Sequence, residues 1–280
     1  MSEIERFKEE ILKNYPRLTP DSPFRFECHH GLACFNACCG DVNIFLTPYD
    51  IIRLKQALGI SSSEFLAKFT LAPFDKKLRY PIRLLKMNDD QKKTCPFVSE
   101  QGCTVYGDRP WACRMFPLGL ASPSEEDKSV EDEFYFLLQE SICQGFGGKR
   151  EWTVGDWLKD QGITEYTKVG DLFKEITLHP FFREGKELKP QAMEMFHMVC
   201  YDIDKFRGFV FESSFLEKFE VAEDVRQAIK EDDVELLKFG FLWLRFALFG
   251  ERTMILKEGV EQTVKRKMQD KVDQAKATGK

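Results

Sequence analysis

Cysteine is the residue type that dominates the chemistry available to this sequence. Eight of the nine cysteines lie in the first half, and the first four fall within the twelve residues Cys28-His-His-Gly-Leu-Ala-Cys34-Phe-Asn-Ala-Cys38-Cys39. Thiolates are soft ligands that favour zinc and iron–sulfur clusters over magnesium or calcium. Eight of them could satisfy two four-coordinate zinc ions, or one four-iron cluster together with a second site. The predicted ligands are Cys28, Cys34, Cys38, Cys39, Cys95, Cys103, Cys113 and Cys143.

The adjacent pair Cys38–Cys39 restricts how these ligands can be used. Consecutive side chains diverge, so the two thiols seldom serve one tetrahedral ion together. Either they serve two metals or a multi-iron cluster, or one of them is not a ligand. The spacings match neither repeated CxxC zinc knuckles nor the ferredoxin CxxCxxC run, so zinc and iron both remain open. The alternative role of a small buried hydrophobe is favoured only for Cys200.

The expected compartment decides between metal ligation and disulfide bonding. The stretch MSEIERFKEEILKNYP is acidic and amphipathic and lacks the apolar run of a secretory signal. We therefore expect a cytoplasmic protein in a reducing environment, where clustered cysteines indicate metal or redox sites. The most apolar run, Phe239–Phe249, is flanked and interrupted by charged residues, which predicts a buried helix and no membrane span.

Composition narrows the classes of partner. The chain has 280 residues, 43% of them hydrophobic, and a formal net charge of −5, which is typical of a globular protein. An acidic excess argues against a general nucleic-acid binder, which would carry a basic field. The expected partners are a metal ion and, as a further option, another protein, with neither nucleic acid nor a membrane.

One block of the sequence resembles a known family. It reads Cys95-Pro-Phe-x5-Cys103-Thr-Val-Tyr-x2-Arg109-Pro-x2-Cys113-Arg114-x-Phe-Pro, and it resembles the cysteine-cluster family of zinc- or iron-chelating proteins over about residues 26–148. Many members have a first cluster of the form Cys-x2-Cys-x2-Cys-Cys, whereas this chain has Cys-x5-Cys-x3-Cys-Cys. The wider form is similar to that of flagellin lysine methylases, bacterial enzymes tied to S-adenosylmethionine and an iron–sulfur cluster.

Several other residues of the motif could support the cysteines. Arg109 and Arg114 flank Cys113, so they are candidate cofactor-binding residues that donate hydrogen bonds to thiolates or sulfides. An ordinary salt bridge with a local carboxylate is the alternative for both. His29 and His30 adjoin Cys28 and could ligate a metal, although exposed loop histidines are the commoner case.

The remaining patterns predict the elements that must position these residues. Thr47-Pro48-Tyr49-Asp50 is a helix start, with Thr as the N-cap and Pro at the first helical position, and the helix should end at Gly59. Ser122–Asp132 is expected to be a loop. One strand is expected within 77–87, followed by a turn at 88–90, and another near 133–138. Helices are expected over 3–15, 61–69, 111–115, 165–178, 190–207, 212–219, 222–230, 232–249 and 255–275.

These patterns lead to a prediction of fold and function. The expected fold is α+β and helix-dominated: an irregular cysteine-rich metal-binding domain, 1–150, with a small antiparallel sheet, followed by a helical domain, 151–280. The expected function is binding of zinc, or of an iron or iron–sulfur centre such as a 4Fe–4S cluster, through the clustered cysteines. By its resemblance, the alternative is an S-adenosylmethionine-linked protein lysine methylase with an iron–sulfur cluster. The sequence leaves open whether the protein is an enzyme.

Overall fold

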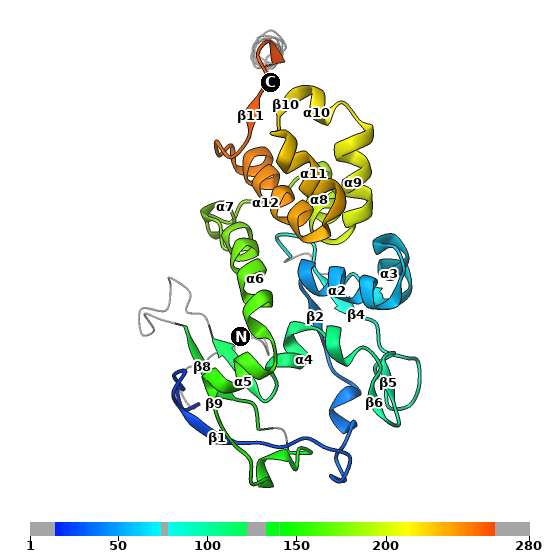
Figure 1. Cartoon of the computed structure of the whole chain (residues 1–280), viewed down its shortest axis with the longest axis vertical. Coiled ribbons are helices and arrows are strands. Elements are labelled where there is room, and N and C mark those ends of the chain that lie inside the picture. Colours follow the sequence, from blue (N-terminus) through cyan, green and yellow to red (C-terminus); the bar gives the residue numbers. More distant parts are fainter. Residues whose placement is uncertain (1–14, 74–77, 122–132, 140, 261–280) are drawn as a thin grey trace. The chain divides into compact units, whose positions relative to one another are not determined.

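The computed structural model describes residues 15–73, 78–121, 133–139 and 141–260 (Figure 1). The chain divides into two compact units. The first contains the described parts of 1–58, 68–73 and 82–170, and the second contains the described parts of 59–67, 74–81 and 171–280. All eight predicted ligands lie in the first unit, and Cys200 lies in the second. The division into a metal-binding domain at 1–150 and a helical domain at 151–280 stays a prediction.

The first unit contains several short antiparallel sheets instead of the single one expected from the sequence. They are β1 (Pro23–Arg25) with β9 (Glu151–Thr153), β5 (Val98–Ser99) with β6 (Gly102–Cys103), β7 (Leu118–Ala121) with β8 (Phe134–Leu137), and the three-stranded sheet β2 (Phe45–Leu46), β4 (Arg83–Leu85), β3 (Thr70–Leu71). In Figure 1, β1 and β9 lie side by side although they are far apart in sequence.

Helices and tight turns connect these strands. The helices that lie wholly or partly in the first unit are α2 (Pro48–Leu58), α3 (Ser62–Phe69), α4 (Trp111–Met115), α5 (Val154–Asp160) and α6 (Ile163–Thr177), and 3₁₀ turns occur at Ala37–Cys39, Tyr106–Asp108 and Gly145–Gly147. Helix α2 begins where the sequence predicts. The Thr47 amide donates to the Asp50 carboxylate (2.7 Å) and the Asp50 amide to the Thr47 hydroxyl (3.1 Å), which satisfies two free helix-start donors.

The core of the first unit forms around β1, β9 and the helices α4 and α5. Trp157 stands at its centre, edge-on to Phe24 and Phe26 at ring-centroid distances of 6.0 and 5.5 Å. Its indole N–H donates to the Met115 carbonyl at 3.3 Å, so the polar edge of the ring is satisfied. Each such buried aromatic side chain contributes about 1.5–3 kcal/mol. This core therefore fixes the segment just before Cys28 against the helix that carries Cys113.

The second unit is almost entirely helical. It contains the remainder of α3 and α6 together with α7 (Pro180–Arg183), α8 (Pro190–Tyr201), α9 (Ile203–Glu212), α10 (Phe215–Lys218), α11 (Glu223–Glu231) and α12 (Asp233–Phe249), and β10 (Phe219–Glu220) pairs with β11 (Ile255–Leu256). The helix predicted over 190–207 is two helices that meet at Asp202. Of the helix predicted over 255–275, the described residues 255–260 begin with a strand, and residues 261–275 lie outside the described part of the chain. Residues 3–14 of the helix predicted over 3–15 and the loop predicted over 122–132 also lie outside it.

Helix α12 forms the centre of the second unit. A Cβ at Gly240 would lie 2.5 Å from a Val199 methyl carbon and 2.8 Å from the Phe206 ring, so α12 packs closely on α8 and α9. The helix starts at Asp232, which accepts from the amides of Val234 and Glu235, and ends at Gly250 with a left-handed φ of 73°. Within the described ranges, no helix is both long and apolar enough to cross a membrane. The structure confirms the helix-dominated α+β class.

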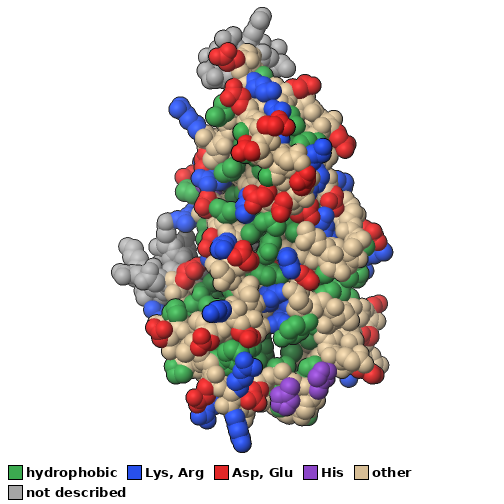
Figure 2. All heavy atoms as spheres, in the orientation of Figure 1, with side chains coloured by type: hydrophobic (Ala, Val, Ile, Leu, Met, Phe, Trp, Pro, Cys, Tyr) green, Lys and Arg blue, Asp and Glu red, His purple; other side chains and the backbone are tan. Residues whose placement is uncertain are grey.

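The surface carries charges of both signs. On the face shown in Figure 2, acidic and basic side chains are interspersed, in keeping with 46 acidic and 41 basic residues in the sequence. The face shown therefore differs from the continuous basic surface that typically binds the phosphate backbone of nucleic acids.

Candidate metal centre

Backbone pairing brings Cys28 next to the turn that carries Cys143. The β1–β9 pairing extends by one bond, from the Phe26 amide to the Arg150 carbonyl at 3.1 Å, and the next amide, that of Glu27, donates to the Gly145 carbonyl at 3.0 Å. A Cβ at Gly145 would lie only 2.7 Å from the Glu27 carbonyl oxygen, so the close approach depends on glycine at this position. Residues separated by more than a hundred positions in sequence are therefore neighbours here.

Cys34 joins the same place through its sulfur. The Gln144 amide donates to the Cys34 Sγ at 3.2 Å, which ties the loop after Cys28 to the residue that follows Cys143. Electrostatics place Cys38 with them. Burial raises the pKa of the Cys28 thiol, and the nearby charges of Cys38, Cys34 and Cys143 raise it further. We call Cys28, Cys34, Cys38 and Cys143 the first thiol group.

The other four predicted ligands meet at a different set of segments. The Cys95 amide donates to the Cys39 carbonyl at 2.7 Å, and the Val98 amide donates to the Cys95 carbonyl at 3.1 Å. Val98 in β5 pairs with Cys103 in β6, so Cys95 and Cys103 lie at the base of one small hairpin. Burial raises the pKa of Cys95, and the charge of Cys103 adds to this rise.

Cys113 completes this second arrangement from helix α4. Burial raises the pKa of its thiol to about 12, and the charges of Cys95, Asp50 and Cys103 contribute to the rise. The pKa of Cys39 is raised by its hydrogen bond to Cys38, by burial, and by the charges of Cys38, Cys95 and Cys113. We call Cys39, Cys95, Cys103 and Cys113 the second thiol group.

The two groups meet at the Cys38–Cys39 peptide. Both residues lie in the 3₁₀ turn Ala37–Cys39, which follows Asn36 in a left-handed conformation with φ 65°. A hydrogen bond joins the two thiols and lowers the pKa of Cys38 to about 6, because it stabilises the Cys38 thiolate. The turn thus presents one thiol to each group while keeping the two sulfurs adjacent.

Asp50 holds the helix that carries Cys113, a role the sequence did not reveal. Its side chain is fully buried, and one carboxylate oxygen accepts from the Thr47 amide while the other accepts from the Trp111 amide at 2.8 Å. The same residue thereby starts α2 and anchors the first residue of α4. The sequence marks Asp50 only as a helix-start residue, because the second bond joins segments 61 positions apart.

Arg114 donates hydrogen bonds to three backbone carbonyls. Its Nε donates to the Arg109 carbonyl at 3.0 Å, one terminal nitrogen to the Gln161 carbonyl at 2.7 Å, and the other to the Gly107 carbonyl. The guanidinium also lies over the Tyr166 ring, 4.7 Å from its centroid. These bonds hold the turn before α4 against the end of α5, so Arg114 shapes the segment around Cys113 from behind.

Arg109 occupies the position from which a charge can act on both thiol groups. It is buried, its guanidinium stacks on Tyr106 at 3.8 Å, and it donates to the Gln161 side chain. Its charge lowers the pKa of Cys28 in the first group and of Cys113 in the second. Among the described residues, no ion pair joins Arg109 or Arg114 to a carboxylate. Their predicted hydrogen bonds to thiolates stay predictions.

The other residues considered as metal ligands or buried thiols, His29, His30 and Cys200, make different contacts. His29 and His30 are exposed; the His29 ring accepts from the Gly31 amide at 3.1 Å, and the His30 ring lies 4.1 Å from that of Phe35. Cys200 is buried on α8, as the sequence predicts. All nine cysteines are free thiols.

Neither thiol group is a closed cage. Within the part of the chain that the structure describes, no three His, Cys, Asp or Glu side chains are arranged to hold a metal ion. The groups are defined by hydrogen bonds between the loops and by mutual electrostatic influence. The eight-ligand set therefore stays a prediction.

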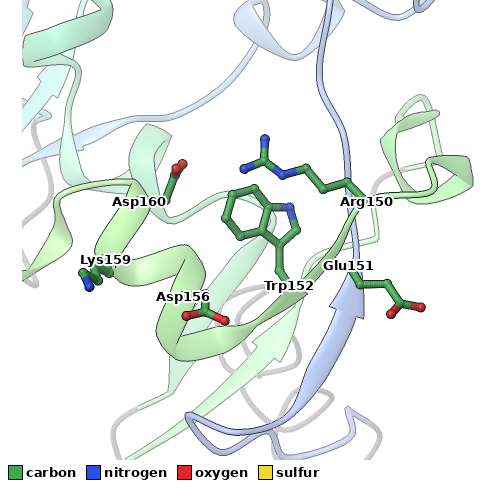
Figure 3. A pocket seen from close by; sticks show the side chains of 6 residues that line it. All are labelled: Arg150, Glu151, Trp152, Asp156, Lys159 and Asp160. Carbon is green, nitrogen blue, oxygen red and sulfur yellow. The ribbon is translucent and has the colours of Figure 1, made fainter.

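A shallow groove lies on the segment that comes after the turn of Cys143 in the sequence. It has a volume of about 540 Å³ and is lined by Arg150, Glu151, Trp152, Asp156, Lys159 and Asp160. Figure 3 shows Arg150 extended across the Trp152 ring, and the guanidinium carbon lies 3.8 Å from the ring centroid. The groove contains no cysteine, so its charged rim is separate from the thiols.

Comparison with known proteins identifies the cysteine-rich segment. Residues 27–144 match the family described as a putative zinc- or iron-chelating domain, and this segment contains all eight cysteines of the two thiol groups. This segment, which is less than half of the chain, is therefore similar to that family. No curated protein and no solved structure matches the chain, so the resemblance to flagellin lysine methylases has no support from these comparisons. The family description agrees with metal binding but does not distinguish zinc from iron.

Proposed function

We propose that this chain binds zinc or iron through the eight cysteines of its first unit. The observation that carries the proposal is the gathering of eight free thiols from four separate segments of one unit, while Cys200 is buried elsewhere. Scattered structural cysteines would show no such preference. The family match over 27–144 independently supports chelation of one of these two metals.

The chemistry of the donor set fits both metals. Thiolates are ligands of zinc and of iron–sulfur clusters, and the groups contain no carboxylate that would favour magnesium or calcium. Because the groups are not closed, the loops must draw the sulfurs together when the metal binds. Metal binding should therefore be coupled to local ordering of these loops, and it should release protons from those thiols whose pKa is raised.

A structural role for the metal follows from the shortness of the strands. The strands of the first unit are two to four residues long, below the usual length of about five or six. The hairpin between Cys95 and Cys103 has only two residues in each strand, and isolated two-stranded hairpins are marginally stable. A metal bound to the thiols would supply cross-links that these sheets lack.

The alternative activity, methyl transfer onto protein lysines, is not favoured by any specific feature of the described residues and stays a sequence prediction. A protein partner for the metal-organised surface likewise stays a prediction.

Metal content and absorption on anaerobically purified protein test the proposal. We expect either a colourless protein with stoichiometric zinc, or iron together with the visible charge-transfer bands of thiolate ligation. Replacing all eight cysteines with serine should abolish metal binding, whereas the control Cys200→Ala should keep it. Equal metal content in the eight-serine variant and the wild type would contradict the proposal, as would a folded wild type that binds neither metal.

A further inference from the structure

We propose that the eight thiols form two separate four-thiol metal centres, one made by the first thiol group and the other by the second. The inference rests on the proposed metal binding and specifies how the ligands are divided. The first centre would contain Cys28, Cys34, Cys38 and Cys143, and the second Cys39, Cys95, Cys103 and Cys113.

Contacts between loops support the first centre. The Glu27–Gly145 hydrogen bond sets Cys28 beside the turn of Cys143, and the bond from the Gln144 amide to the Cys34 sulfur sets Cys34 in the same place. A side-chain hydrogen bond joins the Cys34 and Cys143 thiols, and the charges of Cys34 and Cys38 also act on the Cys143 thiol. The loop that carries Cys28, Cys34 and Cys38 and the turn that carries Cys143 are thus neighbours.

Independent contacts support the second centre. The hydrogen bond from the Cys95 amide to the Cys39 carbonyl and the pairing of Val98 with Cys103 bring the segments of Cys39, Cys95 and Cys103 together. Asp50 anchors the first residue of α4, the helix that carries Cys113, and the charges that act on the Cys113 thiol include those of Cys95 and Cys103.

The geometry of the 3₁₀ turn explains how adjacent cysteines serve different centres. With about 3 residues per turn, consecutive side chains of a 3₁₀ helix point about 120° apart. Cys38 and Cys39 can therefore face different loops from one peptide. Their mutual hydrogen bond means that the two centres would be immediate neighbours.

Neighbouring centres made only of thiolates accumulate negative charge, which must be offset. Arg109 is buried, and its charge acts on Cys28 of the first group and on Cys113 of the second. A single guanidinium whose charge reaches two anionic centres would stabilise both. This arrangement gives Arg109 a use that one isolated centre would not require.

The test compares paired variants reconstituted with zinc alone. Cys28→Ser/Cys143→Ser removes two ligands from the first centre, and Cys28→Ser/Cys103→Ser removes one from each. We expect the same-group variant to keep half of the zinc bound by the wild type, and the cross-group variant to keep almost none. Equal zinc loss in the two variants would overturn the division into two centres.

A measurement on the intact protein covers the case in which a variant does not fold. Cobalt(II) titration of the metal-free wild type should develop tetrathiolate absorption up to two equivalents per chain. Saturation at one equivalent, or absorption typical of sulfur-bridged cobalt ions, would overturn the proposal of separate centres. If the wild type binds neither zinc nor cobalt, it is the proposed metal binding that fails, so the two failures are distinguishable.

Discussion

Replacing Asp50 tests the claim that one buried carboxylate positions the helix of Cys113. Asp50→Ala would leave the Thr47 and Trp111 amides without their acceptors. Each buried donor left unsatisfied costs about 1–3 kcal/mol, so the free energy of unfolding should fall by about 2–6 kcal/mol. Asp50→Asn keeps the shape and one acceptor oxygen, so about 1–3 kcal/mol should be lost.

The two variants also separate hydrogen bonding from charge. Burial raises the pKa of Asp50 from 3.8 to about 6, despite its hydrogen bonds and the charge of Arg114. A carboxyl group with a higher pKa in the folded state binds more protons there, so its contribution to stability decreases as the pH rises from about 4 to 6. The difference in unfolding free energy between wild type and Asp50→Asn should change by at most about 3 kcal/mol over this window.

Urea unfolding of metal-free protein measures both effects, with midpoints compared at constant slope. Glu165→Gln is a matched control, because it removes only an exposed ion pair with Lys168, which should contribute less than about 1 kcal/mol. If Asp50→Ala unfolds within about 1 kcal/mol of the wild type, the anchoring role of Asp50 is wrong. A pH profile that Asp50→Asn leaves unchanged would contradict the effect of burial on its pKa.

Three further predictions concern the loops and their metal. Gly145→Ala places a methyl group 2.6 Å from the Phe26 ring, so it should displace the turn of Cys143 and weaken zinc binding. The control Gly147→Ala, whose methyl group meets no atom within 4 Å, should leave zinc binding unchanged. Equal zinc affinities of the two variants in titrations would count against the close approach at Gly145. Arg114→Ala removes three charge-assisted hydrogen bonds to carbonyls and should destabilise the fold by several kcal/mol, about 1.5–3 kcal/mol for each bond. Arg114→Lys should not restore the stability, because an ammonium group lacks the planar guanidinium fork. Unfolding of either variant at the urea concentration of the wild type would refute this. Metal removal should increase hydrogen exchange within 27–144 far more than in α12, and uniform protection would contradict a structural metal.

Local patterns in the sequence predicted the start of α2 well, because that start carries its own signal. Thr47 and Asp50 begin α2 through contacts only three residues apart, and these contacts form wherever the chain goes next. The break at Asp202 was missed because its side chain accepts hydrogen bonds from Ser62 and Ser63, about 140 positions away. The periodicity of apolar residues continues through that point and carries no sign of the bend.

The candidate site shows the same division between local and long-range information. Thiol chemistry and spacing identified which cysteines to examine, since residue type alone determines what a ligand prefers. Their grouping depends on the approach of Glu27 to Gly145 and of Cys39 to Cys95, which no local pattern encodes. Arg114 likewise had the motif position of a residue that donates hydrogen bonds to thiolates. Each of its three side-chain nitrogens instead donates to a backbone carbonyl that the fold brings within reach.

The proposed metals would join segments that the fold itself connects weakly. A first centre would close a loop of about 115 residues between Cys28 and Cys143, and a second would close about 74 residues between Cys39 and Cys113. Loop-closure entropy grows only with the logarithm of length, so the two closures differ by about 0.4 kcal/mol. Separation in sequence is therefore little obstacle to either centre. What limits metal binding is the local geometry at the sulfurs. Gly145, Asp50 and Arg114 hold the backbone segments from which the loops must still draw the sulfurs together.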